Sequence, residues 1–162
     1  MLFLGIDQHA RQLTVSLRDQ SGDVLLARQV STQPEKILEF FDHLTRRCAQ
    51  LEEPFIAVVE VCGFNDWLIR MLRDYRCHKV ILIQPEERKR CKTDRRDAAA
   101  LSELLWLNRD RFLEGKPVRG LRQVNICSTI QQENRKLSTM RKEAGQAQTQ
   151  LVNKIKHILR RH

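Results

Sequence analysis

The run of residues 55–61 constrains the fold most strongly, because it is apolar throughout except at Glu60. A strand of this composition is typical of a sheet that is covered on both faces. Amphipathic patterns flank the run, with apolar residues recurring at helical spacing over residues 37–51 and 68–75. The chain is therefore predicted to form an α/β domain in which helices cover a central sheet.

The other strand-like runs specify the order of the elements. Residues 2–7, 12–18 and 24–30 are joined by tight turns, which predicts an antiparallel meander. Residues 79–83 form the fifth strand, and a third helix is expected over residues 94–107. The order β-β-β-α-β-α-β-α is that of ribonuclease H-like folds, so we expect a mixed five-stranded sheet with flanking helices.

Two of the expected helices carry a start signal. Thr32 and Glu35 have the spacing of a capping box, with Pro34 in the first turn. Thr93 is the expected N-cap of the third helix. These signals predict that the first helix begins directly after Thr32 and the third directly after Thr93.

The C-terminal part has a different pattern. We expect a globular domain over residues 1–112, followed by a charged linker over residues 113–121 and a coiled-coil helix over residues 122–162. The apolar seam of this helix needs a partner to cover it, which predicts a homo-dimer or higher oligomer through residues 126–158. The seam positions are Ile126, Ile130, Glu133, Leu137, Met140, Ala144, Ala147 and Leu151, continued by Ile155 and Ile158 after a one-residue slip.

The charge of the chain is unevenly distributed. Residues 1–85 carry a net charge of −1 and residues 86–162 carry +10, which together give the formal +9 of the whole chain. This basic second half predicts a polyanionic partner, with nucleic acid first. The alternative interpretation is a basic helix surface that only faces solvent.

Composition excludes several classes of protein. Apolar residues make up 41% of the chain, enough for a core, but no run approaches the length of a membrane span. The first seven residues lack a basic flank and reach a carboxylate at Asp7, unlike a signal peptide. The five cysteines include no C-x-x-C pair, so neither a disulfide framework nor a zinc site is indicated. We expect a protein of the reducing cytosol.

Four carboxylates occupy positions that the predicted fold brings together. Asp7 ends the first strand and Glu60 nearly ends the fourth, and these strands are expected to be parallel neighbours. Asp94 and Asp97 lie three residues apart in the first turn of the third helix. Clustered carboxylates need a cation, and hard oxygen ligands favour Mg²⁺ or Mn²⁺. Two such ions would clamp the attacking and leaving oxygens of a phosphodiester. Taken singly, each acid also fits a turn, a strand end or a helix-dipole position.

Basic residues surround the last two of these acids. They are expected to contact a phosphate backbone beside the carboxylates, the alternative being a loop exposed to solvent. His9 follows Asp7 by two residues and is a candidate for assisting metal binding or proton transfer, or else a hairpin residue. The predicted nucleic-acid-binding residues are Arg88, Lys89, Arg90, Lys92, Arg95 and Arg96.

Several short motifs resemble one known family. They are Gly-Ile-Asp-Gln-His at 5–9, Val-Glu-Val-Cys-Gly at 59–63, Gln-Pro at 84–85 and Lys-Thr-Asp-Arg-Arg-Asp-Ala at 92–98. Together they resemble the insertion sequence one-ten family of DEDD transposases, relatives of Piv-type DNA invertases. The resemblance covers essentially the whole chain and implies a RuvC-like N-terminal domain followed by a coiled coil. It also implies that Asp7, Glu60, Asp94 and Asp97 are the catalytic, metal-binding tetrad.

The resemblance further implies a function in the bacterial cytosol or nucleoid. Such proteins carry out DNA transposition by metal-dependent strand cleavage and exchange, guided by a structured bridge RNA within an oligomer. Two features depart from the family pattern. Gln8 and His9 replace the two residues that more commonly follow the first acid. The family's C-terminal domain, which carries a nucleophilic serine, is not reached before the sequence stops at His162. We therefore expect this chain alone to be inactive in transposition.

Other functions share some of these features. A free-standing RuvC-like, structure-selective nuclease would use the same carboxylates but would leave the long helix unexplained. An inert truncated transposase that dimerises and binds nucleic acid would explain the helix without catalysis. An actin-like kinase half also has a strand ending in Gly-Ile-Asp, but the six glycines here form no Gly-x-Gly phosphate loop.

Overall fold

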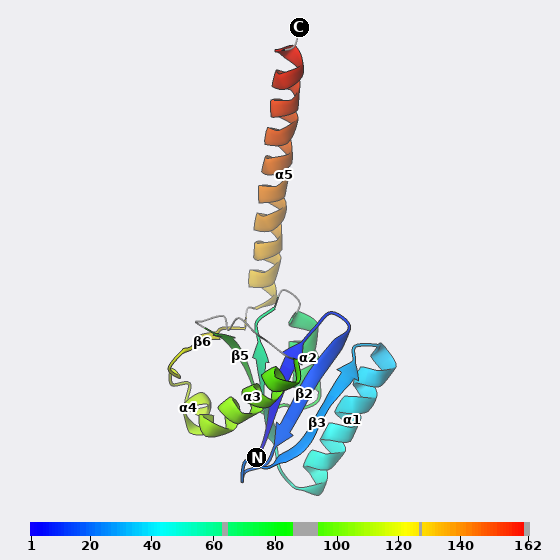
Figure 1. The fold of residues 1–162 in the computed structure, drawn as a ribbon, viewed down its shortest axis with the longest axis vertical. Coiled ribbons are helices and arrows are strands. Elements are labelled where there is room, and N and C mark those ends of the chain that lie inside the picture. The colour runs from blue at the N-terminus through cyan, green and yellow to red at the C-terminus, as the bar shows by residue number, and fades with distance from the viewer. Residues whose placement is uncertain (63–64, 86–93, 127, 161–162) are drawn as a thin grey trace. The chain divides into compact units, whose positions relative to one another are not determined.

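The computed structural model describes residues 1–62, 65–85, 94–126 and 128–160. The chain divides into two compact units, Met1–Val124 and Asn125–His162. The first unit contains a sheet and four helices, and the second contains one long helix (Figure 1). The α/β class expected from the sequence is confirmed.

The sheet is mixed and has six strands in the order β3-β2-β1-β4-β5-β6. The strands β1, β2 and β3 form the predicted antiparallel meander. The next two strands, β4 and β5, run parallel to β1, and β6 pairs antiparallel with β5. The strand bounds are β1 Leu2–Gln8, β2 Gln12–Arg18, β3 Val24–Ser31, β4 Phe55–Glu60, β5 Lys79–Pro85 and β6 Leu121–Val124.

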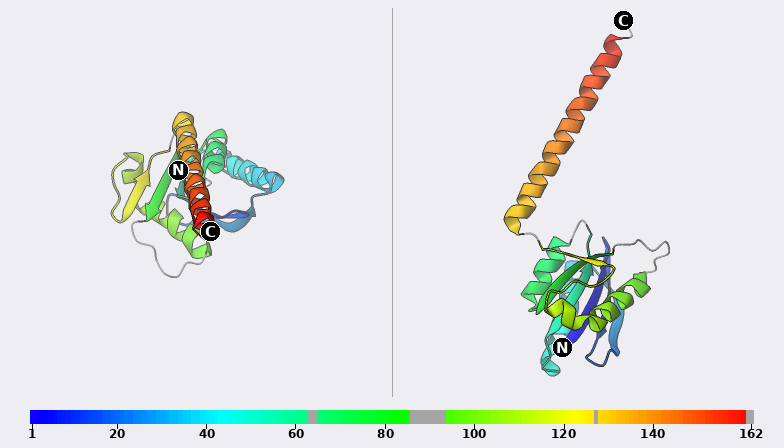
Figure 2. Two further views of the ribbon diagram at one scale, coloured as in Figure 1. Left: turned by 90° about the horizontal axis from the view of Figure 1, so that it is seen from above. Right: turned by 90° about the vertical axis from the view of Figure 1, so that its left-hand side faces the viewer.

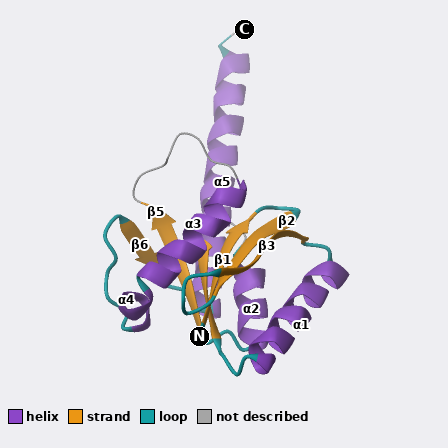
Figure 3. Cartoon of the chain, turned by 60° about the horizontal axis from the view of Figure 1, so that its bottom comes forward, coloured by secondary structure: helices purple, strands orange, loops and turns teal. Residues whose placement is uncertain are grey.

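Helices cover both faces of the sheet, as Figures 2 and 3 show. On one face, α1 buries Ile37, Phe40, Phe41 and Leu44, and α2 buries Leu68, Ile69 and Leu72. On the other face, α3 and α4 pack on Phe3, Ile56, Val58, Ile81 and Ile83 through Leu101, Leu105 and Phe112. The helix bounds are α1 Pro34–Gln50, α2 Asp66–Asp74, α3 Asp94–Leu107, α4 Arg109–Leu113 and α5 Thr129–Leu159.

The sheet extends one strand further than the predicted five. Residues 113–121 were expected to be a linker and 122–162 a helix, but Leu121–Val124 pair with β5. This pairing covers backbone groups that would otherwise be left open at the edge of β5. The long helix starts only at Thr129, where Ser128 and Gln131 form a reciprocal capping box. Ile126 therefore lies before the helix.

The expected capping box at Thr32 and Glu35 is also wrong. The N-cap of α1 is Gln33, with no side-chain cap hydrogen bond, and Pro34 lies in the first turn. The Thr32 hydroxyl instead donates to the Ala10 carbonyl over 3.3 Å, which ties the start of α1 to the β1–β2 turn. Thr93, the expected cap of α3, lies outside the described residues.

The second unit is dominated by α5, which is 31 residues long. Its apolar seam is exposed along the helix, with Ile130, Leu137, Met140 and Leu151 each at least 60% exposed. Among the helices that the structure describes, none is both long and apolar enough to cross a membrane.

Candidate functional site

Three of the four predicted carboxylates line one hollow of about 210 Å³. Asp7 and Glu60 come from the adjacent ends of the parallel strands β1 and β4, where Ile6 pairs with Val59. Asp97 comes from the first turns of α3. The convergence predicted from strand order is therefore present in the structure. The hollow is lined by Asp7, Gln8, His9, Glu60, Val61, Cys62 and Asp97.

Gly5 brings α3 close enough to β1 for Asp97 to reach this hollow. A β-carbon built on Gly5 would collide with the backbone amide of Ser102 and lie 2.5 Å from the Ala98 carbonyl oxygen. Only glycine lets the backbone of the helix rest directly on the strand at this point. The crossing lies two residues before Asp7 on β1 and one to five residues after Asp97 on α3, so it brings the elements that carry the two acids together.

A buried polar cluster holds the same helix on β2. The Ser16 and Ser102 hydroxyl oxygens lie 2.8 Å apart, and both residues are almost fully buried. Arg18 donates from Nε to Ser102 Oγ over 3.2 Å and from its Nη1 group to the Gly22 carbonyl over 2.7 Å. Because buried polar groups are costly unless paired, these contacts favour one seating of α3.

His9 interacts directly with Asp7. Its Nε2 lies 3.0 Å from Asp7 Oδ2, with the side chains of Asp7 and His9 respectively 14% and 41% exposed. A ring nitrogen at this distance orients the carboxylate and satisfies one of its oxygens. Of the two interpretations of His9, the structure therefore favours a contact with the site over a simple hairpin position.

Asn65 joins two segments of the hollow, the end of β1 and residues 60–62, and was missed by the sequence analysis. Its Nδ2 donates to Gln8 Oε1 over 2.9 Å and to the Glu60 carbonyl over 3.2 Å. Its Oδ1 accepts from the Cys62 amide over 2.6 Å. Asn65 is 6% exposed, so these bonds are made in a largely dry environment. The one signal in the sequence was a polar residue close after a buried strand.

A comparison with known protein families identifies the chain. Residues 4–162 match the sequence model of the insertion sequence 110 family of DEDD proteins, described as transposase. The chain belongs to this transposase family. No curated protein matches the chain significantly. The family acts in DNA transposition, binds DNA and generally uses divalent metal ions.

The remaining predicted site residues of this DEDD transposase lie partly outside the described residues. Asp94, Arg95 and Arg96 belong to the first turn of α3, but only their backbone is described. Arg88, Lys89, Arg90 and Lys92 lie outside the described residues altogether. The predicted phosphate-contacting cluster therefore stays a prediction.

The donor set suits the metal that such transposases use. Carboxylate oxygens are the preferred ligands of Mg²⁺ and Mn²⁺, and Asp7, Glu60 and Asp97 supply them at one hollow. Within the described part of the chain, however, no three His, Cys, Asp or Glu side chains are close enough to form a ready metal cluster. The residues thus fit the ion in chemical type, while a ligating arrangement requires them to move closer together.

Proposed function

We propose that this chain supplies the RuvC-like catalytic half of a DEDD transposase acting in the bacterial nucleoid, with Asp7, Glu60, Asp94 and Asp97 as its tetrad. The observation that supports this most is that Asp7, Glu60 and Asp97 line a single hollow. They come from three elements that are 53 and 37 residues apart in sequence. Two bound divalent ions would activate the attacking group and stabilise the leaving oxygen of a phosphodiester.

The chain's own residues would prepare this site in distinct ways. His9 holds Asp7 Oδ2 and keeps the carboxylate turned toward the hollow. Asn65 fixes the end of β4 against the end of β1, so that Glu60 and Asp7 stay adjacent. Gly5 and Ser102 seat α3, which carries the remaining two acids. The basic segment at residues 88–96 would position the phosphate backbone of DNA or of a guiding bridge RNA.

The exposed seam of α5 supports an oligomer as the working form. Several large apolar residues recur along one side of this helix and are largely exposed. A second copy of α5 is the partner that matches such a stripe in length and spacing. We infer a homo-dimer or higher oligomer in which paired α5 helices join two catalytic domains.

Manganese binding tests the site. The full chain should gain thermal stability in millimolar Mn²⁺, because an ion that binds only the folded state stabilises it by mass action. Asp7→Asn and Asp97→Asn should abolish this gain, whereas Asp110→Asn on α4 should retain it. Equal gains in all four proteins would show that the ion binds elsewhere and would refute the tetrad assignment.

A further inference from the structure

A second hollow, of about 560 Å³, lies between α1 and the β2–β3 hairpin. We name it the α1 groove and define it by Arg28, His43, Arg46, Arg47 and the apolar residues beneath them. It lies on the opposite face of the sheet from the candidate site. Arg28 pairs with Val15 and Asp7 with Thr14, and consecutive residues of a strand project to opposite faces.

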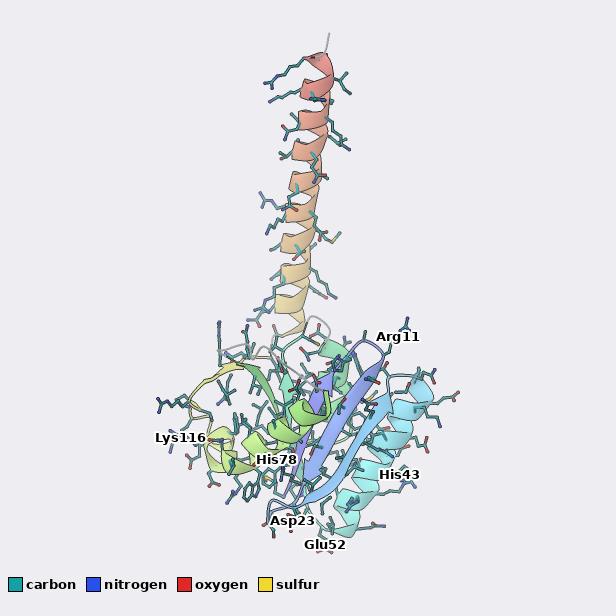
Figure 4. The ribbon with its side chains drawn as sticks, in the orientation of Figure 1. Arg11, Asp23, His43, Glu52, His78 and Lys116 are labelled. Carbon is teal, nitrogen blue, oxygen red and sulfur yellow. The ribbon has the colours of Figure 1, made fainter. Side chains whose placement is uncertain are left out.

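The groove has a strongly basic wall without acidic partners. Arg46 and Arg47 are exposed on α1, and Figure 4 shows His43 on the same helix beside β3. No acidic residue lines the hollow, and the three arginines form no ion pair with other described residues. The groove therefore presents arginine side chains that have no direct ion pair with a described carboxylate.

Two acids of α1 have interactions of their own. Glu39 lies 3.4 Å from Lys36 Nζ, and Asp42 is close enough to the Tyr75 hydroxyl to interact with it electrostatically. Neither residue lines the hollow. Guanidinium groups bind phosphates through paired donors, and their positive charge here is available to an anionic ligand.

The floor of the groove is apolar. Leu26 and Leu51 line it, and the Arg28 guanidinium lies over the Phe40 ring with its carbon 5.1 Å from the ring centroid. The aromatic ring therefore lies beside this guanidinium, and both side chains line the hollow. Unpaired bases stack on arginine planes held in this way, whereas the bases of a duplex are not accessible to them.

We propose that the α1 groove binds a single-stranded segment of nucleic acid, with Arg46 and Arg47 on its phosphates and Arg28 against a base. The site is separate from the hollow lined by Asp7, Glu60 and Asp97. The inference rests on the proposed function only in taking nucleic acid as the partner. An acidic peptide would match the charge but would leave the stacking surface on Arg28 unused.

Fluorescence anisotropy of the full chain with labelled RNA and DNA strands of about 12 nucleotides tests the proposal. Arg46→Ala/Arg47→Ala should raise Kd about 25-fold at 0.1 M salt and lower the salt slope by about 1.4, since each phosphate contact with a single strand contributes about 0.7. The matched control is Arg111→Ala/Arg119→Ala, which removes the same charge from exposed positions outside the groove. It should change Kd less than two-fold. Comparing the RNA and DNA strands shows which one the chain prefers. Weaker binding of either strand by Arg46→Ala/Arg47→Ala supports the groove.

Three results would overturn the proposal. If the unsubstituted chain binds a strand and both double variants bind it equally well, nucleic acid binds elsewhere and the proposed function stands. If polyglutamate binds as tightly as a nucleic-acid strand, and Arg46→Ala/Arg47→Ala abolishes that polyglutamate binding, the partner of the groove is an acidic protein segment. If no strand binds the unsubstituted chain at all, both the groove and the nucleic-acid partner of the proposed function fail.

Discussion

The side-chain amide of Asn65 donates to the Gln8 side-chain oxygen over 2.9 Å, joining the loop before α2 to the end of β1. The same Nδ2 group also donates to the Glu60 carbonyl, and the Asn65 side-chain oxygen accepts from the Cys62 backbone amide. One buried side chain therefore ties together the segments that carry two of the proposed metal ligands. We therefore expect both the folding stability of the first unit and its affinity for metal to depend on Asn65.

Asn65→Ala should lower the free energy of unfolding by about 2 kcal/mol or more, because it leaves buried hydrogen-bonding groups without partners. Urea denaturation measures this change. The variant should also bind Mn²⁺ more weakly at temperatures where it is fully folded. Ile37→Ala, which removes buried apolar volume from α1 on the other face of the sheet, serves as the control for destabilisation alone. Equal Mn²⁺ affinity in both variants would contradict a role for Asn65 in the site.

Gly5→Ala should destabilise the first unit by at least about 2 kcal/mol, because the added methyl group meets the backbone of α3. Thermal unfolding followed by near-ultraviolet circular dichroism measures the loss. Gly145→Ala in α5 is the matched control, since a β-carbon there meets nothing within 4 Å. It should leave the unfolding of the sheet unchanged and raise helix content slightly. Similar effects of the two substitutions would refute the close crossing at Gly5.

Much of the first unit was predictable because its signals are local and strong. The apolar run over residues 55–61 predicted a strand covered on both faces, and strand order placed it parallel to β1. The ends of parallel neighbours meet at one edge of a sheet, so Asp7 and Glu60 could be placed together. Periodicity located α3, and Asp97 followed from its position in the first turns.

The features that were missed depend on contacts distant in sequence. The four-residue strand β6 has no alternating pattern of its own and forms because β5 offers an open edge. The predicted cap of α1 was wrong because the Thr32 hydroxyl donates a hydrogen bond to the carbonyl of Ala10, in a turn 22 residues earlier. Asn65 acts through Gln8, 57 residues earlier, as well as through the nearby Glu60 and Cys62, and no spacing rule identifies such a residue. Single polar residues in loops are read from structure, not from periodicity.

Cys77 gives a pH-dependent prediction. Burial raises the pKa of its thiol to about 12, and the thiol donates to the Lys79 carbonyl over 3.3 Å. The folded pKa lies above the unfolded value, so the thiol's contribution to stability is complete below about pH 9 and is lost as the pH rises toward 12. Cys77→Ser keeps a donor but does not titrate in this range. The stability difference between wild type and Cys77→Ser, measured in urea, should therefore shrink above pH 9. A difference independent of pH up to 10.5 would contradict the buried-thiol assignment.

The last prediction concerns the seam of α5. Leu137 and Met140 are each 64% exposed, and neighbouring seam positions carry Ile130 and Leu151. Burying an aliphatic side chain of this size contributes about 1.5–3 kcal/mol, so pairing two such helices favours association even though Ala144 and Ala147 add little. Leu137→Asp places a charge in that seam and should dissociate the dimer without altering the unfolding of the first unit, because Asn125–His162 form a separate unit.

Light scattering at micromolar concentrations measures the assembly. Wild type should have at least twice the 19.1 kDa mass of one chain, and Leu137→Asp should have the mass of one chain. Gln146→Asp introduces the same side chain two residues after Ala144, off the seam, and should leave the mass unchanged. A wild-type protein of one-chain mass at every concentration would refute the paired helix. Loss of the dimer in both variants would point to an interface governed by net charge instead of by the apolar seam.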